Sequence, residues 1–597
     1  MGAIINHPFL IPNEIEGRGY QLKALNTILD TSSLLVLPTG SGKTPIELMA
    51  IADRLFQFPE KKALLIAPTN PLLDQHYKDS KKLLNIPSDS IAMINGSINW
   101  EKREKIIENA KLILATPQVI RNDVNRGSLS LSNYSIIVLD EAHHSTGNHA
   151  MAQVADMYLE QSTSGLLIGA TASPGSTETA IVNLTKRLDS HRIFSMQRND
   201  PLIKPYTTEL DSNVILLDLP KKIEDLVAPL KKWLEDMVEK LQRSGVYLHK
   251  GVITTSGLND AMKRASRLID RNNQYGWKAI KITADSIRVL QLINLLTTQG
   301  IISTRKYMER SVMQFEKGEK KLGRFVQKKE FITLQKELMN MKEIHNKIEK
   351  VLELVKEQIE LDPKSRIIVF SSLRDSARSI SIALNSLTEI NATPFIGQSS
   401  KEGDEGMNQK QQINTLNKFR EGELNVLVAT SVGEEGLDIP SADRVIFFEP
   451  VASEIRTIQR RGRTGRHREG HIFILVSKDT RDEGIRFAAA AKEVRMHRIL
   501  NRVKNQHKLS LKLNKPIDRL KRFSIELDKN SLSAKSFIEL EEERLKEIPK
   551  KFNSNSNKIE EHEKILKTSK QNISISQRLR PRGQLGLEEF EEGSSEE

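Results

Sequence analysis

Two stretches of the chain alternate short apolar runs with segments of helical periodicity. In the first stretch the runs end in polar turns and lie at 33–36, 63–69, 112–117, 135–144 and 165–174. Continuous apolar runs bounded by turns are typical of strands buried on both faces of a parallel sheet. The pattern predicts an α/β domain over residues 1–205, with its functional residues at the carboxyl ends of the strands.

The same pattern returns near residue 341 and predicts a second α/β domain over residues 341–510. Its apolar runs lie at 366–372, 393–397, 425–431, 444–450 and 471–477. Between the two domains, after a run at 213–220, the chain is dominated by long charged helical segments, which predict a helical insert over residues 206–340. From about residue 545 the chain has too little apolar content to fold stably, so 511–597 is predicted to be a helical extension and a flexible tail.

Composition narrows the class of protein. The 597 residues include no cysteine, which excludes disulfides and thiolate metal sites, and the chain has neither a charged leader nor an eighteen-residue apolar run. We therefore expect a soluble cytoplasmic protein. The net charge of +13 favours an anionic partner such as nucleic acid, although 90 basic against 77 acidic residues also suits a merely soluble surface.

The segment LPTGSGKTPI (37–46) lies between the run at 33–36 and a helical pattern. Its glycines leave backbone N–H groups free to surround phosphate oxygens, while Lys43 supplies a charge and Thr44 a hydroxyl for Mg²⁺. Pro45 suits the first turn of a helix, where an N–H has no partner to lose. The segment predicts a nucleotide-phosphate site formed by Leu37, Pro38, Thr39, Gly40, Ser41, Gly42, Lys43 and Thr44.

Two adjacent acids, Asp140 and Glu141, follow the apolar run that starts at residue 135. One carboxylate at a strand end can hold Mg²⁺ through water, and the other can polarise water for in-line attack on the γ-phosphate. Adjacent acids at a strand end are more often solvated turn residues, but the phosphate loop on another strand reverses that preference. We assign Asp140 to the metal and Glu141 to the base.

A third element, QRRGRTGR (459–466), is rich in arginine. A bare arginine-rich run favours a solvated surface or a nucleic-acid patch. However, Gln459, Arg463 and Arg466 are spaced at i, i+4 and i+7, which places them on one helical face. Such a face can present guanidinium groups to a phosphate bound by another domain.

Together these elements resemble the ordered motifs of superfamily 2 helicases, and most closely those of archaeal Hef and its eukaryotic relative FANCM. The resemblance covers about residues 10–500 and is carried by RGYQ (18–21), PTGSGKT (38–44), APTNPLLDQH (67–76), ATPQVIRND (115–123), DEAH (140–143), TASPGS (171–176), VFSSLRDSA (369–377), ATSVGEEGLDIP (429–440) and QRRGRTGRH (459–467). It implies two RecA-like motor domains flanking the insert, with ATP and Mg²⁺ as cofactors and 3′-to-5′ movement.

The resemblance also implies roles for further residues. Gln21 would read the adenine edge, and Gly436 and Asp438 would approach the nucleotide. Thr171 and Ser173 would couple hydrolysis to domain motion. The backbone of one nucleic-acid strand would be held by Thr69, Thr116 and Thr430. Outside this context, a turn or helix cap would be the better interpretation of each threonine.

The insert carries most of the excess charge. Residues 221–340 contain 24 lysine and arginine residues against 13 aspartate and glutamate residues. In Hef-like proteins this insert is thought to grip branched duplexes, and the densest basic run here, 317–329, includes Lys320, Lys321 and Arg324. A solvated helical spacer is the alternative interpretation, because charged runs commonly have no partner.

Two features concern the C-terminal region. No ERKxxxD motif of an XPF-type nuclease occurs, so we predict a helicase without its own nuclease, which would act with a separate one. Gln584, Leu587 and Phe590 resemble a sliding-clamp (PCNA) box, although Glu591 stands where a second aromatic is usual. A plain solvated tail is the alternative.

The sequence thus predicts an ATP-dependent DNA helicase or translocase that acts on forked or branched DNA in replication-fork repair and recombination. A duplex-RNA-stimulated ATPase of the RIG-I or Dicer kind shares the architecture and remains the alternative.

Overall fold

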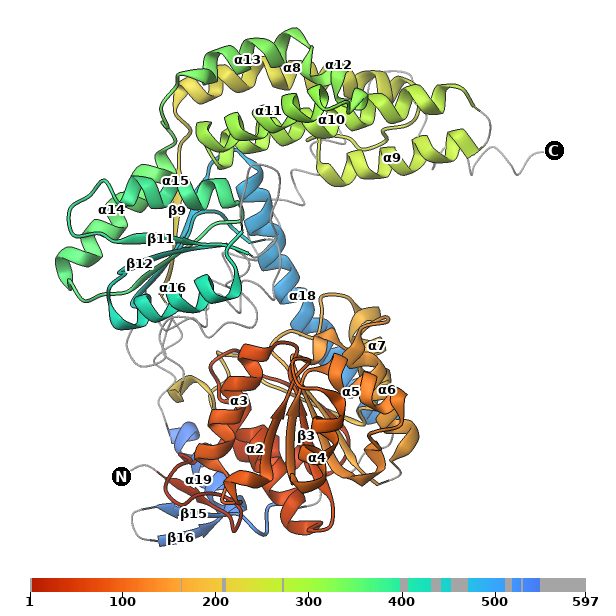
Figure 1. Ribbon diagram of the computed structural model, residues 1–597, viewed down its shortest axis with the longest axis vertical. Helices are drawn as coiled ribbons and strands as arrows, with labels where there is room; N and C mark the ends of the chain where they lie inside the picture. The colour runs from red at the N-terminus through yellow and green to blue at the C-terminus, as the bar shows by residue number, and fades with distance from the viewer. Residues whose placement is uncertain are drawn as a thin grey trace. The chain divides into compact units, whose positions relative to one another are not determined.

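The computed structural model describes residues 3–162, 164–206, 211–270, 273–397, 406–430, 442–451, 471–510, 518–527 and 530–547. Two parallel sheets are each covered by helices, and a group of long helices forms a further part of the chain (Figure 1). The predicted fold class, two α/β domains with a helical insert, is confirmed.

The first domain is built on seven parallel strands in the order β4-β5-β3-β6-β7-β2-β8. The runs predicted as strands are strands, and their side chains are almost wholly buried because helices cover both faces. The strands are β2 (Ser33–Val36), β3 (Lys62–Ile66), β4 (Ile91–Ile94), β5 (Leu112–Ala115), β6 (Tyr134–Asp140), β7 (Leu166–Thr171) and β8 (Arg192–Ser195). The helices are α1 (Gly19–Ile28), α2 (Lys43–Gln57), α3 (Asn70–Leu83), α4 (Trp100–Asn109), α5 (Pro117–Arg126), α6 (Ala150–Gln161) and α7 (Glu178–Arg187).

The second domain has six parallel strands in the order β11-β12-β10-β13-β14-β9. Apolar clusters on both faces of the sheet form its core. The strands are β9 (Asp211–Leu217), β10 (Ile367–Phe370), β11 (Ala392–Phe395), β12 (Val426–Ala429), β13 (Arg444–Phe447) and β14 (His471–Ser477). The helices are α14 (Asn346–Leu361), α15 (Arg374–Leu384), α16 (Gln409–Glu421) and α18 (Arg481–Ser510).

One strand changes the domain organisation that the sequence suggests. β9 pairs with β14 along its whole length, from Asp211 opposite His471 to Leu217 opposite Ser477. Residues 211–217 fall within the range assigned to the insert, yet they form an edge strand of the second sheet. The insert proper begins with the helix that follows.

The insert consists of helices that leave and return beside the second domain. They are α8 (Lys221–Arg243), α9 (Thr255–Asp270), α10 (Tyr275–Thr298), α11 (Ile301–Glu316), α12 (Gly323–Val326) and α13 (Lys329–Met339). At its core Trp233 stacks on Phe325 with ring centroids 5.9 Å apart, and Phe331 meets Phe325 edge to face at 5.0 Å. Residues 235–287 form a compact unit of their own, in which α9 buries Leu258, Ala261 and Ala265.

The two ends of the described chain meet in a small sheet. Strand β1 (Ile4–Asn6) pairs antiparallel with β15 (Ser524–Leu527), which forms a hairpin with β16 (Asn530–Ser533), and helix α19 (Ala534–Glu547) follows (Figure 1). The extension predicted to be helical therefore begins with a β-hairpin, because β1 offers it a pairing edge. Among the described residues, no helix combines the length and apolar character needed to cross a membrane.

Candidate active site

The phosphate loop links β2 to α2. Gly40 and Gly42 adopt left-handed conformations with φ of +81° and +74°, which other residues tolerate poorly. The Ser41 hydroxyl donates a hydrogen bond of 2.6 Å to the carbonyl of Pro38 and closes the loop. Helix α2 begins at Lys43, so its free N–H groups face the loop and Pro45 lies in the first turn as predicted.

Helix α1 is bonded directly to this loop. The buried Gln21 donates from Nε2 to the Gly42 carbonyl at 3.3 Å, and the Tyr20 hydroxyl donates to the Ser41 carbonyl at 2.7 Å. A Cβ at Gly42 would lie 2.3 Å from Gln21 Nε2, and the left-handed backbone at this position also favours glycine. Gln21, assigned to adenine, therefore lies against the phosphate loop.

Three predicted elements meet at adjacent strand ends. β7 lies between β6 and β2, with Asp140 opposite Ala170 and Val36 opposite Thr171. The Leu37 amide donates to the Thr171 carbonyl at 3.2 Å. The strand order thus brings the phosphate loop, Thr171 and the acidic pair to one edge of the sheet, as expected for parallel strands.

The acidic pair has a defined geometry. Glu141 has a left-handed backbone with φ of +52°, and its amide donates to Asp140 Oδ1 at 2.9 Å. His143 Nδ1 lies 3.3 Å from Glu141 Oε2 and 3.1 Å from Thr171 Oγ1. His143 therefore connects the acid assigned as base to the residue assigned to coupling.

Two residues that sequence reasoning missed lie beneath Asp140. Asp140 Oδ2 is 2.8 Å from Nε2 of the buried His76 on α3. Glu47 on α2 is fully buried, and its ligand atom lies within 4.8 Å of those of His76 and Asp140. His76 ends the motif APTNPLLDQH, but only the pairing of β3 with β6 brings it to Asp140.

The ionisable groups in this cluster shift one another's pKa values. Burial opposes the charged imidazole of His76, but the bond and charge of Asp140 raise its pKa to about 9. Burial opposes ionisation of Asp140 too, yet His76 and Lys43 lower its pKa. Burial and then Asp140 raise the pKa of Glu47 to about 8, so Glu47 is the protonated member at neutral pH.

Family models match both domains. The DEAD/DEAH box helicase model covers residues 18–180, and the helicase conserved C-terminal domain model covers residues 346–468. The crystal structure of the Pyrococcus furiosus Hef helicase domain is 36% identical, with a TM-score of 0.62, and the match covers 79% of this chain and 98% of that one. The chain belongs to the Hef family of superfamily 2 helicases.

Curated relatives of this Hef-family chain bear names of both DNA and RNA helicases. A putative ATP-dependent RNA helicase of Methanocaldococcus jannaschii is 35% identical over 83% of this chain and 62% of the relative. The ATP-dependent DNA helicase fml1 of Schizosaccharomyces pombe is 31% identical over 79% of this chain and 58% of the relative. The chain thus spans about three fifths of the length of each of these two relatives.

The residues of this Hef-family site fit the cofactors that the family implies. Mg²⁺ prefers hard oxygen ligands, which the Thr44 hydroxyl and the Asp140 carboxylate supply. Each Asp140 oxygen makes one hydrogen bond to protein, and a carboxylate oxygen has two lone pairs, so capacity for a metal or its water remains. Thr39 Oγ1 is buried with no hydrogen-bond partner among the described residues, in the loop where phosphate is expected.

Of the two residues assigned to coupling, Thr171 and Ser173, the second contacts a helix of the second domain. Thr171 Oγ1 accepts from the Ser173 amide at 3.1 Å, and Ser173 Oγ donates to Met496 Sδ of α18 at 3.1 Å. Further along α18, Leu500 and Val503 join the apolar core of the first domain. Helix α18, which follows β14, therefore runs from the second sheet to the turn that carries Ser173.

The three strand-end threonines differ from one another. Thr69 and Thr116 occupy the N-cap positions of α3 and α5, but neither side chain caps its helix. Thr69 Oγ1 is buried with no hydrogen-bond partner in the described part of the chain. The Thr430 hydroxyl instead donates a bond of 3.4 Å to the Phe395 carbonyl. Two of the three threonines therefore occupy a helix-cap position, but their side chains do not make the capping hydrogen bond.

Several residues that were predicted to be functional do not belong to this strand-end site or lie outside the described residues. Lys320, Lys321 and Arg324 are exposed in the insert, on the short turn 320–322 and on α12. Those outside the described residues are Gly436, Asp438, Gln459, Arg463, Arg466, Gln584, Leu587 and Phe590.

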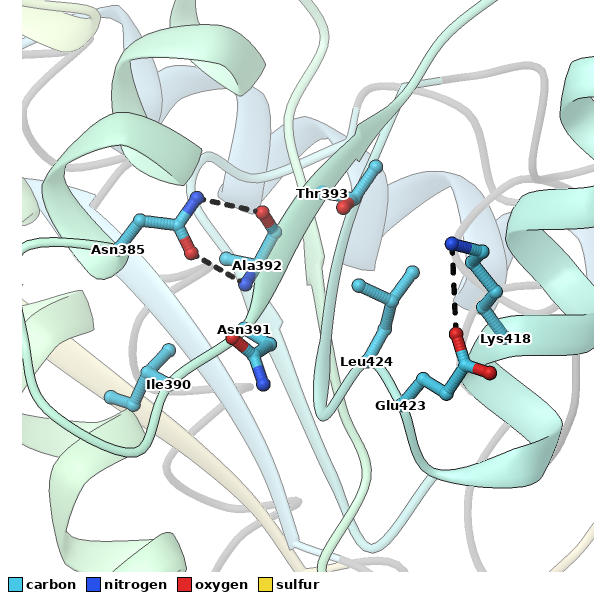
Figure 2. Close-up of a pocket in the computed structure, with 8 residues that line it drawn as sticks. All are labelled: Asn385, Ile390, Asn391, Ala392, Thr393, Lys418, Glu423 and Leu424. Atoms are coloured by element: carbon cyan, nitrogen blue, oxygen red, sulfur yellow. Dashed lines mark hydrogen bonds and ion pairs between the residues drawn. The ribbon is translucent and has the colours of Figure 1, made fainter.

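The second domain has a shallow pocket of about 460 Å³ that is unrelated to this site. Figure 2 shows its lining, in which Asn385 bonds both backbone polar groups of Ala392 and Lys418 pairs with Glu423. The pocket lies beside the start of β11 and before β12, at the amino ends of the strands. Ligands of such sheets bind at the carboxyl ends, so we assign it no role in nucleotide binding.

Proposed function

We propose that this Hef-family protein is an ATP-dependent DNA helicase or translocase that acts on forked or branched DNA in replication-fork repair and recombination and moves 3′ to 5′. The meeting of the phosphate loop, the Asp140–Glu141 pair and Thr171 at adjacent strand ends carries the proposal. The family relationship and the basic insert support it.

Each group of site residues has a different role in ATP hydrolysis. Lys43 and the N-terminus of α2 hold the phosphates, and Thr44 and Asp140 would hold Mg²⁺, which neutralises charge on the phosphate oxygens when bound. Glu141 accepts a proton from the attacking water and orients it. Gln459, Arg463 and Arg466 contact the γ-phosphate from the second domain and stabilise its charge in the transition state.

Movement follows from the presence or absence of the γ-phosphate. His143 joins Glu141 to Thr171, and Thr171 is bonded to Ser173, which contacts α18. A change at the phosphate thus reaches a helix that continues from the second sheet. Thr69, Thr116 and Thr430 grip the backbone of one strand, so the motion is independent of base sequence.

The key experiment compares ATP hydrolysis stimulated by forked DNA with that stimulated by duplex RNA. We expect forked DNA to stimulate hydrolysis. Stimulation by RNA alone would instead establish the RIG-I-like or Dicer-like alternative, and the M. jannaschii relative is named as a putative RNA helicase.

Glu141→Gln should abolish hydrolysis, and Arg466→Ala should spare ATP binding more than hydrolysis. Forks with separately labelled strands test the polarity.

Two partners are also part of the proposal. A sliding clamp would bind Gln584, Leu587 and Phe590, and a separate nuclease would cleave the DNA. Binding of purified PCNA should be lost in a Gln584→Ala, Phe590→Ala variant and retained in Glu591→Gln. Cleavage of labelled forks by the chain alone with Mg²⁺ would contradict the need for a separate nuclease.

A further inference from the structure

The C-terminal extension, residues 518–547, is bonded to the helix that carries Gln21. The Arg519 amide donates to Oδ1 of Asn26 on α1 at 2.9 Å. Glu542 forms an ion pair with Lys23, which also lies on α1. Glu541 of α19 accepts a hydrogen bond from the amide of Gly19, the first residue of α1. Helix α19 and the β15–β16 hairpin lie beside the N-terminal elements in Figure 1.

Glu541 makes a second contact at the same end of α1. Its other carboxylate oxygen accepts from the hydroxyl of Tyr206, whose pKa is raised by burial and then by this bond. The Tyr206 ring lies 5.1 Å from the Arg18 guanidinium and 5.8 Å from the Tyr20 ring. One carboxylate therefore fixes both the first amide of α1 and an aromatic ring packed against its first residues.

The contacts continue without a gap into the phosphate loop. Gly19, which Glu541 holds, is followed by Tyr20 and Gln21, and these two bond the carbonyls of Ser41 and Gly42. The approach at Gly19 is so close that a Cβ there would lie 2.4 Å from Glu541 Oε2. The favourable effect of a negative charge at a helix N-terminus strengthens the attachment.

We propose that Glu541 is a positioning residue for recognition of the nucleotide base, and that α19 completes the ATP site of the first domain by fixing α1 against the phosphate loop. The proposal rests on the proposed function in one respect, because it takes Gln21 as the residue that reads adenine. Without Glu541, α1 and its glutamine shift relative to the loop while the phosphate contacts of Lys43 remain.

The test uses the full chain and three variants at Glu541 and its partner. Glu541→Ala should raise the KM for ATP about five-fold, as expected when charge-assisted hydrogen bonds are lost, with kcat within about two-fold. The preference for ATP over GTP in kcat/KM should fall as well. Glu541→Gln keeps an acceptor, so its KM for ATP and its ATP preference should stay close to those of the unmodified chain. Tyr206→Phe should raise the KM for ATP by less than Glu541→Ala does.

Glu539→Gln is the matched control, because Glu539 lies exposed on the same helix. A folded Glu541→Ala protein with unchanged KM and unchanged ATP preference would overturn the proposal, even if its melting temperature fell. Equilibrium titration with fluorescent ADP and GDP separates this failure from that of the proposed function. If the unmodified chain fails to hydrolyse ATP, the proposed function fails, while loss of selective ADP binding in Glu541→Ala still supports the role of Glu541.

Discussion

At the scale of single residues, Glu47 is an acid buried beside His76 and Asp140. Both of its carboxylate oxygens are buried and have no hydrogen-bond partner among the described residues. A buried polar group without a partner costs about 1–3 kcal/mol. An unbranched apolar side chain of similar size has no oxygens and so carries no such cost.

We expect Glu47→Met to raise the free energy of unfolding by about 1–3 kcal/mol, because it removes that cost while keeping the volume. Urea unfolding at neutral pH without nucleotide measures the change. Leu48→Met, a volume-conserving change at a buried apolar position on the same helix, is the control and should cost less than about 1.5 kcal/mol. A less stable Glu47→Met protein would show that Glu47 has a stabilising partner.

His345 is buried in its neutral form where the insert returns to the second domain. Nδ1 accepts from the Lys347 amide at 3.2 Å and caps α14, and Nε2 donates to the Thr297 carbonyl at 3.0 Å. Burial and the charge of Lys347 lower its pKa from 6.5 to about 4. Between these values the unfolded chain binds a proton that the folded chain does not, so acid favours unfolding.

The contribution of His345 to stability should therefore fall by about 3 kcal/mol as the pH drops from about 6.5 to 4, since each pKa unit corresponds to about 1.4 kcal/mol. His345→Asn keeps a capping acceptor and removes the titrating group, so its urea midpoint should lose less over the same range. His249→Asn, at an exposed position, is the control. Equal acid sensitivity in His345→Asn and the unmodified chain would refute this assignment.

Residues of the site were predictable from sequence where the chemistry is local. The phosphate loop and the acidic pair each act within a few consecutive residues, so their spacing reveals them. His76 and Glu47 come from two other helices, and their approach to Asp140 depends on strand order and helix packing, which no local pattern encodes. The arginine face at 459–466 stays a prediction.

At the scale of elements, the buried strands were predictable because a short continuous apolar run bounded by turns is typical of a strand covered on both faces. β8 was missed because it carries polar residues at both ends. β4 was missed although its four residues, IAMI, form an apolar run like those of the predicted strands. The sheet to which β9 belongs could not be predicted, because its partner β14 lies more than 250 residues further along the chain. The β15–β16 hairpin was missed for the same reason, since β1 completes its sheet.

The basic turn of the insert gives a prediction at this scale. Lys320, Lys321 and Arg324 are exposed within five residues. If all three contact phosphates, replacing them with alanine should lower the slope of log K against log salt by about 3 for forked DNA, because each contact contributes about 0.9. Fluorescence anisotropy across a salt series measures it, and DNA-independent ATP hydrolysis should not change.

Lys356→Ala, Lys364→Ala, Lys418→Ala is the control for charge alone, because it removes the same number of positive charges from exposed positions on the second domain. An equal change of slope in this control would mean that net charge, and not the basic turn, governs binding. An unchanged slope in the triple variant would favour the solvated-spacer interpretation of the run.

At the scale of the whole molecule, the first domain is completed by the far end of the chain. Leu520, Phe523, Ile525 and Phe537 are buried. Arg522 binds the fully buried Asp53 of α2, with bonds of 2.6 and 3.0 Å. Burial opposes ionisation of Asp53, but His7 and Arg522 lower its pKa, so without Arg522 a buried charge loses one of its two partners.

A chain ending at residue 517 should therefore have a much less stable first domain than the full chain. Fully burying a large apolar side chain contributes about 1.5–3 kcal/mol, so losing four approaches the ~5–15 kcal/mol by which domains are stable. A chain ending at residue 547 keeps every contact described and is the control. Thermal unfolding and limited proteolysis of both should show early melting and cleavage within residues 3–206 only in the shorter chain. Equal stability would mean that the extension binds a domain that is already complete.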